Sequence, residues 1–283
     1  DITGHKILME KQHINYALYN VLKDKNELVD KMNPTSDAKA VKNKVEIENE
    51  KKAHIKDGVA VTRFIYWLKH HIGKERLTEL SVQDKLEEFR KEQEGYIEPS
   101  FATISAYGAN AAMCHYSATK ESDTVLEDHG FYLVDSGGQY YEGTTDITRT
   151  IALGELTEEE KEHFTLVLIS MLRLKEVKFL YGCRGLSLDY VAREPFWSRG
   201  LNFDHGTGHG VGYLLNVHER PNGIRFRMVP ERHDNGVLEA GMITSDEPGL
   251  YIEGSHGIRT ENLMLCRKAE KNMYGQFMRF EFV

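Results

Sequence analysis

Cysteine is scarce in this chain, which has 283 residues and only Cys114, Cys183 and Cys266. The three are far apart and form no CxxC pair, so the sequence predicts neither a disulfide framework nor a cysteine-rich zinc site. Because such isolated thiols are typical of a reducing compartment, we expect a cytoplasmic protein.

Long apolar runs and basic stripes are also missing. No segment approaches the roughly 20 apolar residues of a membrane-spanning helix, and the N-terminal DITGHKILMEKQ has no hydrophobic signal-peptide core. The formal net charge is −8, which argues against a protein that binds nucleic acid through phosphate contacts. The sequence therefore predicts neither a membrane nor a nucleic acid as a partner.

What is present suits a globular protein with a core, because 40% of the residues are hydrophobic and 28% are charged. Residues 1–36 are too few to fold alone, and we interpret them as the remnant of an upstream N-terminal domain with its linker. Residues 37–283 form the main domain. Because the chain lacks an initiator methionine and ends in the strand-like RFEFV, we expect a fragment cut at both ends.

Apolar periodicity and capping residues predict several helices. They are expected at 14–24, 42–72, 81–94, 156–182 and 186–200, with a turn or linker at 31–37. Ser81 is the expected N-cap of the third helix, with Asp84 completing a capping box. Thr157 and Glu160 are the corresponding pair of the fourth helix.

Strands broken by glycine turns are predicted from residue 100 onward, in SFATISAYG, HYSAT, GFYLVDSGGQYYEG and TTDITRTIAL, and again after residue 200. The order helix, strands, helix, strands favours an α+β fold. We expect helices covering one face of a curved, mainly antiparallel sheet.

Two of these strand pairs bring acidic residues together. In 135-DSGGQYYEGTTD-146, a turn near Tyr140–Gly143 is expected to place Asp135 roughly opposite Asp146. In 246-DEPGLYIEGSHGIRTEN-262, a turn centred on residue 254 places Glu247 opposite Glu261. Carboxylates facing each other across a hairpin repel, so both pairs are expected to hold something positive between them.

Histidine joins them in 205-HGTGHGVG-212, where the glycines make a helix improbable. We expect an extended segment that allows the backbone to approach a crowded site, with one histidine pointing into it. A structural zinc site would use more cysteine or histidine than this set of four carboxylates and one imidazole. Oxygen ligands suit Mn²⁺, Mg²⁺ or Ca²⁺, and the added imidazole favours Mn²⁺, Co²⁺, Fe²⁺ or Zn²⁺. Two such ions would support metal-assisted hydrolysis.

The motifs DSGGQYYEGTTDITRT, HGTGHGVGYLLNVHE, DEPGLY and GIRTEN occur here in one order. In that order they resemble the pita-bread metallopeptidases. With SAYGANAAMCHYSAT, the chain is most similar to the cytosolic aminopeptidase P type, the Xaa-Pro aminopeptidases. The resemblance covers about residues 38–283 and implies that residues 37–283 are a pita-bread catalytic domain without its C-terminal continuation.

The resemblance also implies a ligand set for two divalent ions, Mn²⁺ first, with Co²⁺ or Zn²⁺ as alternatives. The set is Asp135, Asp146, His209, Glu247 and Glu261. It implies that Asp146 and Glu261 bridge both ions, that a hydroxide between the metals attacks the scissile carbonyl, and that Glu247 accepts a proton.

Four further residues match positions around the substrate. His115 and His218 match histidines that stabilise the reacting peptide, and His205 and Arg259 match substrate-side positions. The implied substrates are peptides with proline in the second position.

Three alternatives stay open from the sequence. One is an Xaa-Pro dipeptidase, or prolidase, and another is a non-catalytic pita-bread module that binds peptides. A two-metal phosphatase or nuclease shares the ligand chemistry but would need basic residues near the site. Whether the chain forms a homodimer is also left open.

Overall fold

The computed structural model describes residues 2–283. The chain divides into two compact units, one ending at Lys39 and the other spanning Ala40–Val283. Helices and mainly antiparallel strands alternate along the second unit, so the predicted α+β class is confirmed. Among the described residues, no helix has both the length and the apolar composition required to cross a bilayer.

The first unit contains a short strand–helix–strand arrangement. Strands β1 (Lys6–Met9) and β2 (Glu27–Asp30) pair in parallel and are connected through α1 (Tyr16–Lys23). Helix α1 lies within the predicted 14–24 segment, and the Asn15 side chain caps it by accepting a hydrogen bond from the Ala17 N–H at 2.8 Å.

Part of the expected linker at 31–37 is helical, because α2 spans Pro34–Ala40. The Asn33 side chain accepts a hydrogen bond from the Thr35 N–H at 3.1 Å. Pro34 stands at the first helical position, where its missing N–H costs nothing and its fixed φ is favourable. The prediction of a turn was therefore wrong beyond Asn33.

The second unit has its helices close to the predicted segments. They are α3 (Lys44–His71), α4 (Glu79–Lys91), α5 (Glu158–Glu176) and α6 (Gly185–Trp197). The predicted Thr157–Glu160 capping box of α5 is present. That of α4 is shifted, because Thr78 is the N-cap and Ser81 is its reciprocal partner. Serine completes this box as glutamate does elsewhere, so the prediction began the helix too late.

The strands of this unit form short antiparallel sheets. They are β3 (Tyr96–Pro99), β4 (Ile104–Tyr107), β5 (Phe131–Ser136), β6 (Gly138–Tyr140), β7 (Gly143–Thr144), β8 (Ile147–Ala152), β9 (Lys178–Leu180), β10 (Gly208–His209), β11 (Gly223–Ile224), β12 (Ile243–Asp246), β13 (Gly249–Ile252), β14 (His256–Arg259), β15 (Asn262–Asn272) and β16 (Gly275–Phe282). The sheet orders β4-β5-β8 and β12-β15-β16-β9 carry most of the pairing.

The predicted HYSAT strand is absent. The chain after β4 enters a 3₁₀ turn, η1 (Gly108–Ala112), and continues as a loop to residue 124. Hydrogen bonds from this loop converge on the buried side chain of Glu79, including one from the Tyr116 hydroxyl at 2.9 Å. Hydrogen bonds to one buried side chain, in place of pairing between strands, thus hold this segment.

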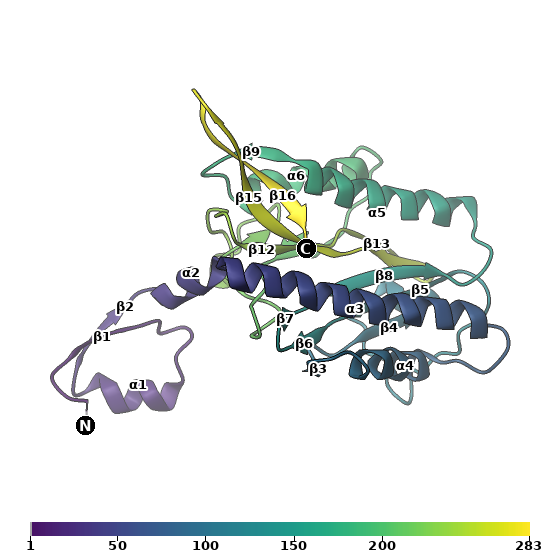
Figure 1. The fold of residues 1–283 in the computed structure, drawn as a ribbon, viewed down its shortest axis with the longest axis horizontal. Coiled ribbons are helices and arrows are strands. Elements are labelled where there is room, and N and C mark those ends of the chain that lie inside the picture. Colours follow the sequence, from purple (N-terminus) through teal and green to yellow (C-terminus); the bar gives the residue numbers. More distant parts are fainter. Residues whose placement is uncertain (1) are drawn as a thin grey trace. The chain divides into compact units, whose positions relative to one another are not determined.

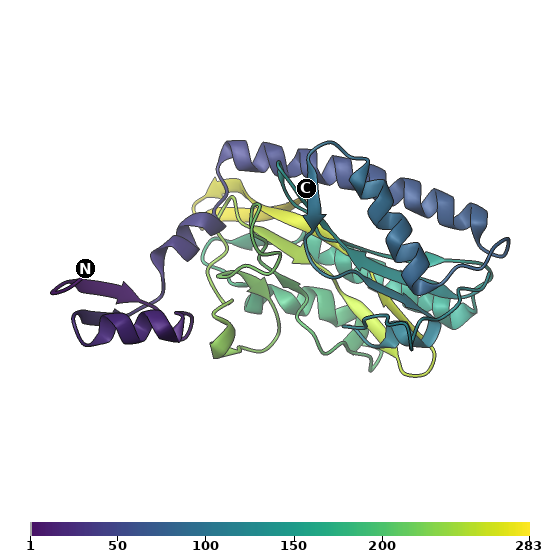
Figure 2. The ribbon, with the colours of Figure 1, turned by 90° about the horizontal axis from the view of Figure 1, so that it is seen from below.

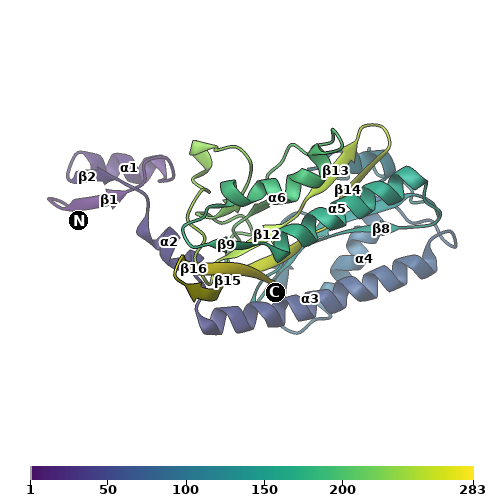
Figure 3. The same ribbon diagram turned by 90° about the horizontal axis from the view of Figure 1, so that it is seen from above.

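Two helix pairs enclose the strands, as Figures 1 and 2 show. Helices α3 and α4 pack on β5 and β8 through Phe64, Leu68 and Leu86. Helices α5 and α6 pack on β13 to β16 through two further apolar clusters, one of which includes Phe196 and Leu250. Figure 3 shows strands running between α3 and α5. Full burial of each such side chain contributes about 1.5–3 kcal/mol. This packing fixes the strands that lie next to the predicted ligands.

Candidate metal centre

The hairpin from β5 to β8 carries both predicted aspartates. Asp135 lies near the end of β5, and Asp146 lies between β7 and β8. The turn of the hairpin is closed by the pair Tyr140 and Gly143. In this register Asp135 lies opposite Thr148, and Asp146 lies two residues before Thr148. The predicted facing pair is therefore wrong, since it needs a turn centred one residue earlier. The two carboxylates are diagonal neighbours instead, and the charge of Asp135 still raises the pKa of Asp146, after the larger effect of burial.

The second hairpin has the predicted register. Gly249 pairs with Arg259 and Ile252 with His256, centred on residue 254. The same register continues between β12 and β15, where Asp246 pairs with Asn262. Glu247 and Glu261 occupy facing positions in the interruption between these two ladders.

Residues 205–212 form no helix. Gly208–His209 are β10, Gly210 bridges to Thr244 of β12, and the rest of this segment is bends and irregular backbone. A Cβ on Gly208 would lie 2.0 Å from the carbonyl oxygen of Ser245, so this approach requires glycine. His209 Nδ1 lies 3.0 Å from the Gly210 carbonyl oxygen, which can only accept. The proton is therefore on Nδ1, and the lone pair of Nε2 is left for the site. That nitrogen is 3.4 Å from both Asp146 Oδ2 and Glu247 Oε1.

Three ligand types converge in this space. One ligand atom each from Asp146, His209 and Glu261 lies within 4.8 Å of the others. Burial raises the pKa of Asp146 and Glu261 well above the usual range, and neighbouring carboxylates raise both further. Burial also raises the pKa of Glu247. Without a bound cation, these three carboxyl groups therefore favour their neutral, protonated form.

The unpaired oxygens of the centre fit divalent cations. Among residues 2–283, Asp135 Oδ1 and Glu261 Oε1 are buried without a hydrogen-bond partner. The second oxygen of each is held, since Arg259 Nη2 donates to Asp135 Oδ2 and Thr148 Oγ1 donates to Glu261 Oε2, both at 2.7 Å. Ser245 Oγ donates to Glu247 Oε1 at 3.1 Å. A set in which one oxygen is oriented and the other is free is what a carboxylate-rich metal site requires.

Arg259 and His205 belong to one hydrogen-bonded chain that ends at Asp135. Arg259 donates from Nη2 to Asp135 Oδ2 and from Nη1 to the Tyr251 hydroxyl, both at 2.7 Å. His205 Nδ1 lies 2.8 Å from the Gly206 carbonyl, so its Nε2 accepts from the Tyr251 hydroxyl at 2.7 Å. Tyr251 thus connects the two predicted substrate-side residues.

The remaining predicted residues, His115 and His218, are exposed side chains on loops. The His218 ring lies 4.1 Å from that of His209, between centroids, in an edge-to-face contact. Partial burial, and then His209, lowers the pKa of His218 to about 4. Burial, and then Arg259, lowers the pKa of His205 to about 3, and His115 contributes to both shifts. His115 is therefore close enough to both histidines to affect their charge.

Sequence reasoning missed the residues that support the centre. Thr148 and Tyr251 lie within the motifs DSGGQYYEGTTDITRT and DEPGLY, and Ser245 directly precedes the second, but none of the three was assigned a role. Lys42 is buried beside Glu219, with Nζ 3.4 Å from Glu219 Oε1, and it also donates to the Val211 carbonyl. This pair fixes the loop that carries His218, and no short-range pattern connects residues so far apart.

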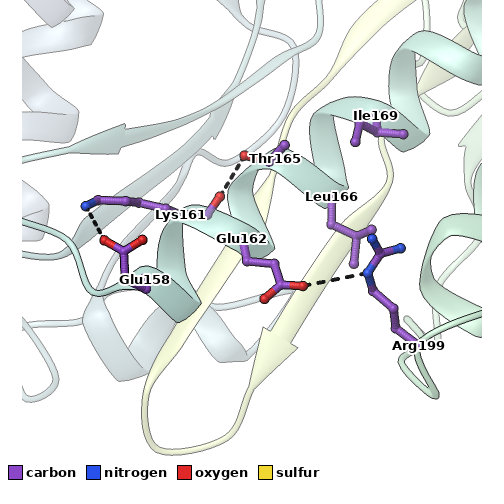
Figure 4. Close-up of a pocket in the computed structure, with 7 residues that line it drawn as sticks. All are labelled: Glu158, Lys161, Glu162, Thr165, Leu166, Ile169 and Arg199. Atoms are coloured by element: carbon purple, nitrogen blue, oxygen red, sulfur yellow. Dashed lines mark hydrogen bonds and ion pairs between the residues drawn. The ribbon is translucent and has the colours of Figure 1, made fainter.

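A separate depression lies on the outer face of α5 and is shown in Figure 4. It contains none of the predicted site residues. Lys161 pairs with Glu158 at 2.7 Å, and Arg199 with Glu162 at 3.7 Å. These exposed ion pairs are typical of a solvated helix face, so we assign the depression no function.

Comparison with known proteins agrees with this geometry. The model of the metallopeptidase family M24 matches residues 48–268. A relative from Paracoccidioides lutzii, described as a probable Xaa-Pro aminopeptidase P, is 42% identical over 258 residues, covering 90% of this chain and 41% of the relative. The chain thus spans about two fifths of that relative's length.

Solved structures show the same arrangement. The X-prolyl aminopeptidase from Caenorhabditis elegans, described as a cytosolic enzyme with a di-nuclear active site, superposes with a TM-score of 0.85 at 35% identity, covering 98% of this chain and 44% of that one. An Xaa-Pro dipeptidase from Bacillus anthracis gives 0.81 at 29% identity, covering 98% and 72%. The expected pita-bread fold is confirmed.

Proposed function

Because the chain belongs to metallopeptidase family M24, we propose that it is the catalytic part of an Xaa-Pro aminopeptidase. It would hydrolyse the bond between an N-terminal residue and a following proline. The observation that carries this proposal is the group of Asp146, His209 and Glu261, whose ligand atoms lie within 4.8 Å of one another beside two further carboxylates.

Two divalent cations would be held by the five predicted ligands, Asp135, Asp146, His209, Glu247 and Glu261. Once bound, they would supply an activated water and stabilise negative charge on the carbonyl oxygen. We propose Mn²⁺, with Co²⁺ and Zn²⁺ as alternatives, because carboxylate oxygens outnumber the single imidazole.

Side chains of the chain itself would handle protons and substrate. Glu247 is half-buried, and its carboxylate is oriented by Ser245 at 3.1 Å. It would take the proton of the attacking water and deliver it to the proline nitrogen. His218 is neutral at pH 7, since its pKa is about 4. It and His115 would donate hydrogen bonds to the peptide.

The chain of Arg259, Tyr251 and His205 would form the wall on the substrate side. Arg259 balances the charge of Asp135 at 2.7 Å and fixes its orientation. Burial raises the pKa of Tyr251, and this keeps its hydroxyl protonated as a donor to His205. We propose a cytoplasmic location, which the isolated cysteines and the cytosolic relative support.

Peptide length separates this function from its main alternative. The protein, supplied with Mn²⁺, is expected to cleave Xaa-Pro-Xaa tripeptides and to leave Xaa-Pro dipeptides largely intact. Preference for dipeptides would make it a prolidase, as the likeness to the Bacillus anthracis enzyme allows. Glu247→Gln is expected to lower kcat by about 100-fold or more, and an unchanged kcat would remove Glu247 from the mechanism.

A further inference from the structure

A buried ion pair links the two helices α3 and α4 behind the first ligand hairpin. Arg90 Nε donates to Asp57 Oδ1 at 2.6 Å, and Arg90 Nη2 donates to Asp57 Oδ2 at 3.2 Å. Both side chains are almost completely buried. A pair of this kind adds little net stability over apolar residues, so a role in fixing geometry is the better explanation for its presence.

Asp57 also accepts two hydrogen bonds from the hairpin. The Tyr140 hydroxyl donates to Oδ1 at 3.2 Å, and the Thr145 hydroxyl donates to Oδ2 at 2.5 Å. Thr145 is the residue immediately before Asp146 and is completely buried. The Asp57 carboxylate thus binds the side chain of the residue next to the proposed metal ligand Asp146.

Asp146 itself lies outside the strands, in the gap between β7 and β8, so no ladder pair of its own holds it. Its neighbour Thr145 is held instead. Thr145 Oγ1 accepts from the Gly138 N–H at 2.8 Å, and the Thr145 carbonyl accepts from Ser100 Oγ at 2.8 Å. A Cβ on Gly137 would lie 1.9 Å from that carbonyl oxygen, so the backbones are in close contact there.

We propose that Asp57, locked by Arg90, is a positioning residue for the metal ligand Asp146 and acts through the Thr145 hydroxyl. This inference rests on the proposed function, since it assigns Asp146 to the metal. Partners behind a metal ligand commonly change metal affinity by about 10–100-fold when they are lost. With one residue between hydroxyl and ligand, we expect the lower end of that range.

The test is Mn²⁺ affinity, measured from the electron paramagnetic resonance signal of free Mn²⁺ during titration. Thr145→Val keeps the shape of the side chain and removes its hydroxyl, and it is expected to weaken binding about tenfold. Thr145→Ser keeps the hydroxyl and is expected to restore wild-type affinity. Asp57→Asn, which leaves the Gly138 contact in place, is expected to weaken binding as well.

Thr144→Val is the matched control. Thr144 is equally buried in the same hairpin, and its hydroxyl donates to Gln139 Oε1 at 2.7 Å, not to Asp57. Both valine variants are expected to lose thermal stability, but only Thr145→Val should lose Mn²⁺ affinity. Equal affinity in the two, or no rescue by serine, overturns the inference. Wild-type protein that binds no Mn²⁺ would overturn the proposed function with it.

Discussion

Replacing Glu79 by glutamine tests how the loop that carries His115 is held. Glu79 is completely buried at the start of α4. Its Oε1 accepts from the Tyr107 N–H at 2.7 Å and from Asn110 Nδ2 at 3.1 Å. Its Oε2 accepts from the Tyr116 hydroxyl at 2.9 Å and from the Thr124 N–H at 3.1 Å.

A glutamine keeps the size of the side chain but turns one oxygen into an amide that cannot accept. Whichever way the amide lies, one backbone donor, the Tyr107 N–H or the Thr124 N–H, loses its acceptor. Asn110 Nδ2 also lies 3.3 Å from Oε2, and the Tyr116 hydroxyl can accept from an amide. A hydrogen bond to a charged group contributes about 1.5–3 kcal/mol, so we expect the free energy of unfolding to fall by about that amount. This is a large part of the roughly 5–15 kcal/mol typical of folded proteins.

Urea denaturation by linear extrapolation measures this loss. Glu87→Gln on the same helix is the control, because both oxygens of Glu87 accept from one hydroxyl, that of Tyr96, at 2.7 and 2.8 Å. Its glutamine keeps that partner, so we expect a loss below about 1 kcal/mol. If Glu79→Gln behaves like this control, the reasoning about the loop anchor is refuted.

Three further predictions concern the centre and its supports. In metal-free protein, burial raises the folded-state pKa of Asp146 and Glu261. The unfolded chain therefore loses these protons first, and stability falls as pH rises from about 4 through the folded pKa. Added Mn²⁺ should thus raise Tm more at pH 8 than at pH 5. Lys42→Met removes the buried hydrogen bonds of Lys42 to Glu219 and to the Val211 carbonyl and should cost about 1–3 kcal/mol in urea denaturation. Tyr251→Phe should cost about 1–3 kcal/mol and lower kcat/KM without changing Mn²⁺ affinity.

Each of these has a result that contradicts it. A Tm gain from Mn²⁺ that is equal at both pH values would show that the pKa of Asp146 and Glu261 is not raised in the folded state. A Lys42→Met protein as stable as the wild type would mean that these two hydrogen bonds do not stabilise the fold. Loss of Mn²⁺ binding in Tyr251→Phe would show that the Tyr251 hydroxyl supports the metal site and not only the substrate side.

Local patterns in the sequence predict the hairpins well and their long-range supports poorly. The paired strands of the second hairpin are symmetric about residue 254, so Glu247 and Glu261 face each other as predicted. Two residues, Tyr141 and Glu142, form the loop of the first hairpin, and a one-residue error in its centre misplaced Asp135 relative to Asp146.

The anchors of the site have no local signal. Asp57, Glu79 and Lys42 are buried charged residues whose partners lie far away along the chain, and on helical periodicity alone they resemble solvated polar positions. Their role follows only from tertiary packing, because burial is what makes a carboxylate seek several donors. The HYSAT segment was mistaken for a strand for the same reason.

The most direct test of the central claim is the metal content of the chain together with its cleavage of an Xaa-Pro-Xaa tripeptide, with and without Asp146→Asn. The account predicts two Mn²⁺ ions per wild-type chain with cleavage, and loss of both in the variant, because Asp146 belongs to the cluster with His209 and Glu261. A wild-type chain that binds no divalent metal, or an Asp146→Asn chain that keeps both ions and full activity, would contradict it.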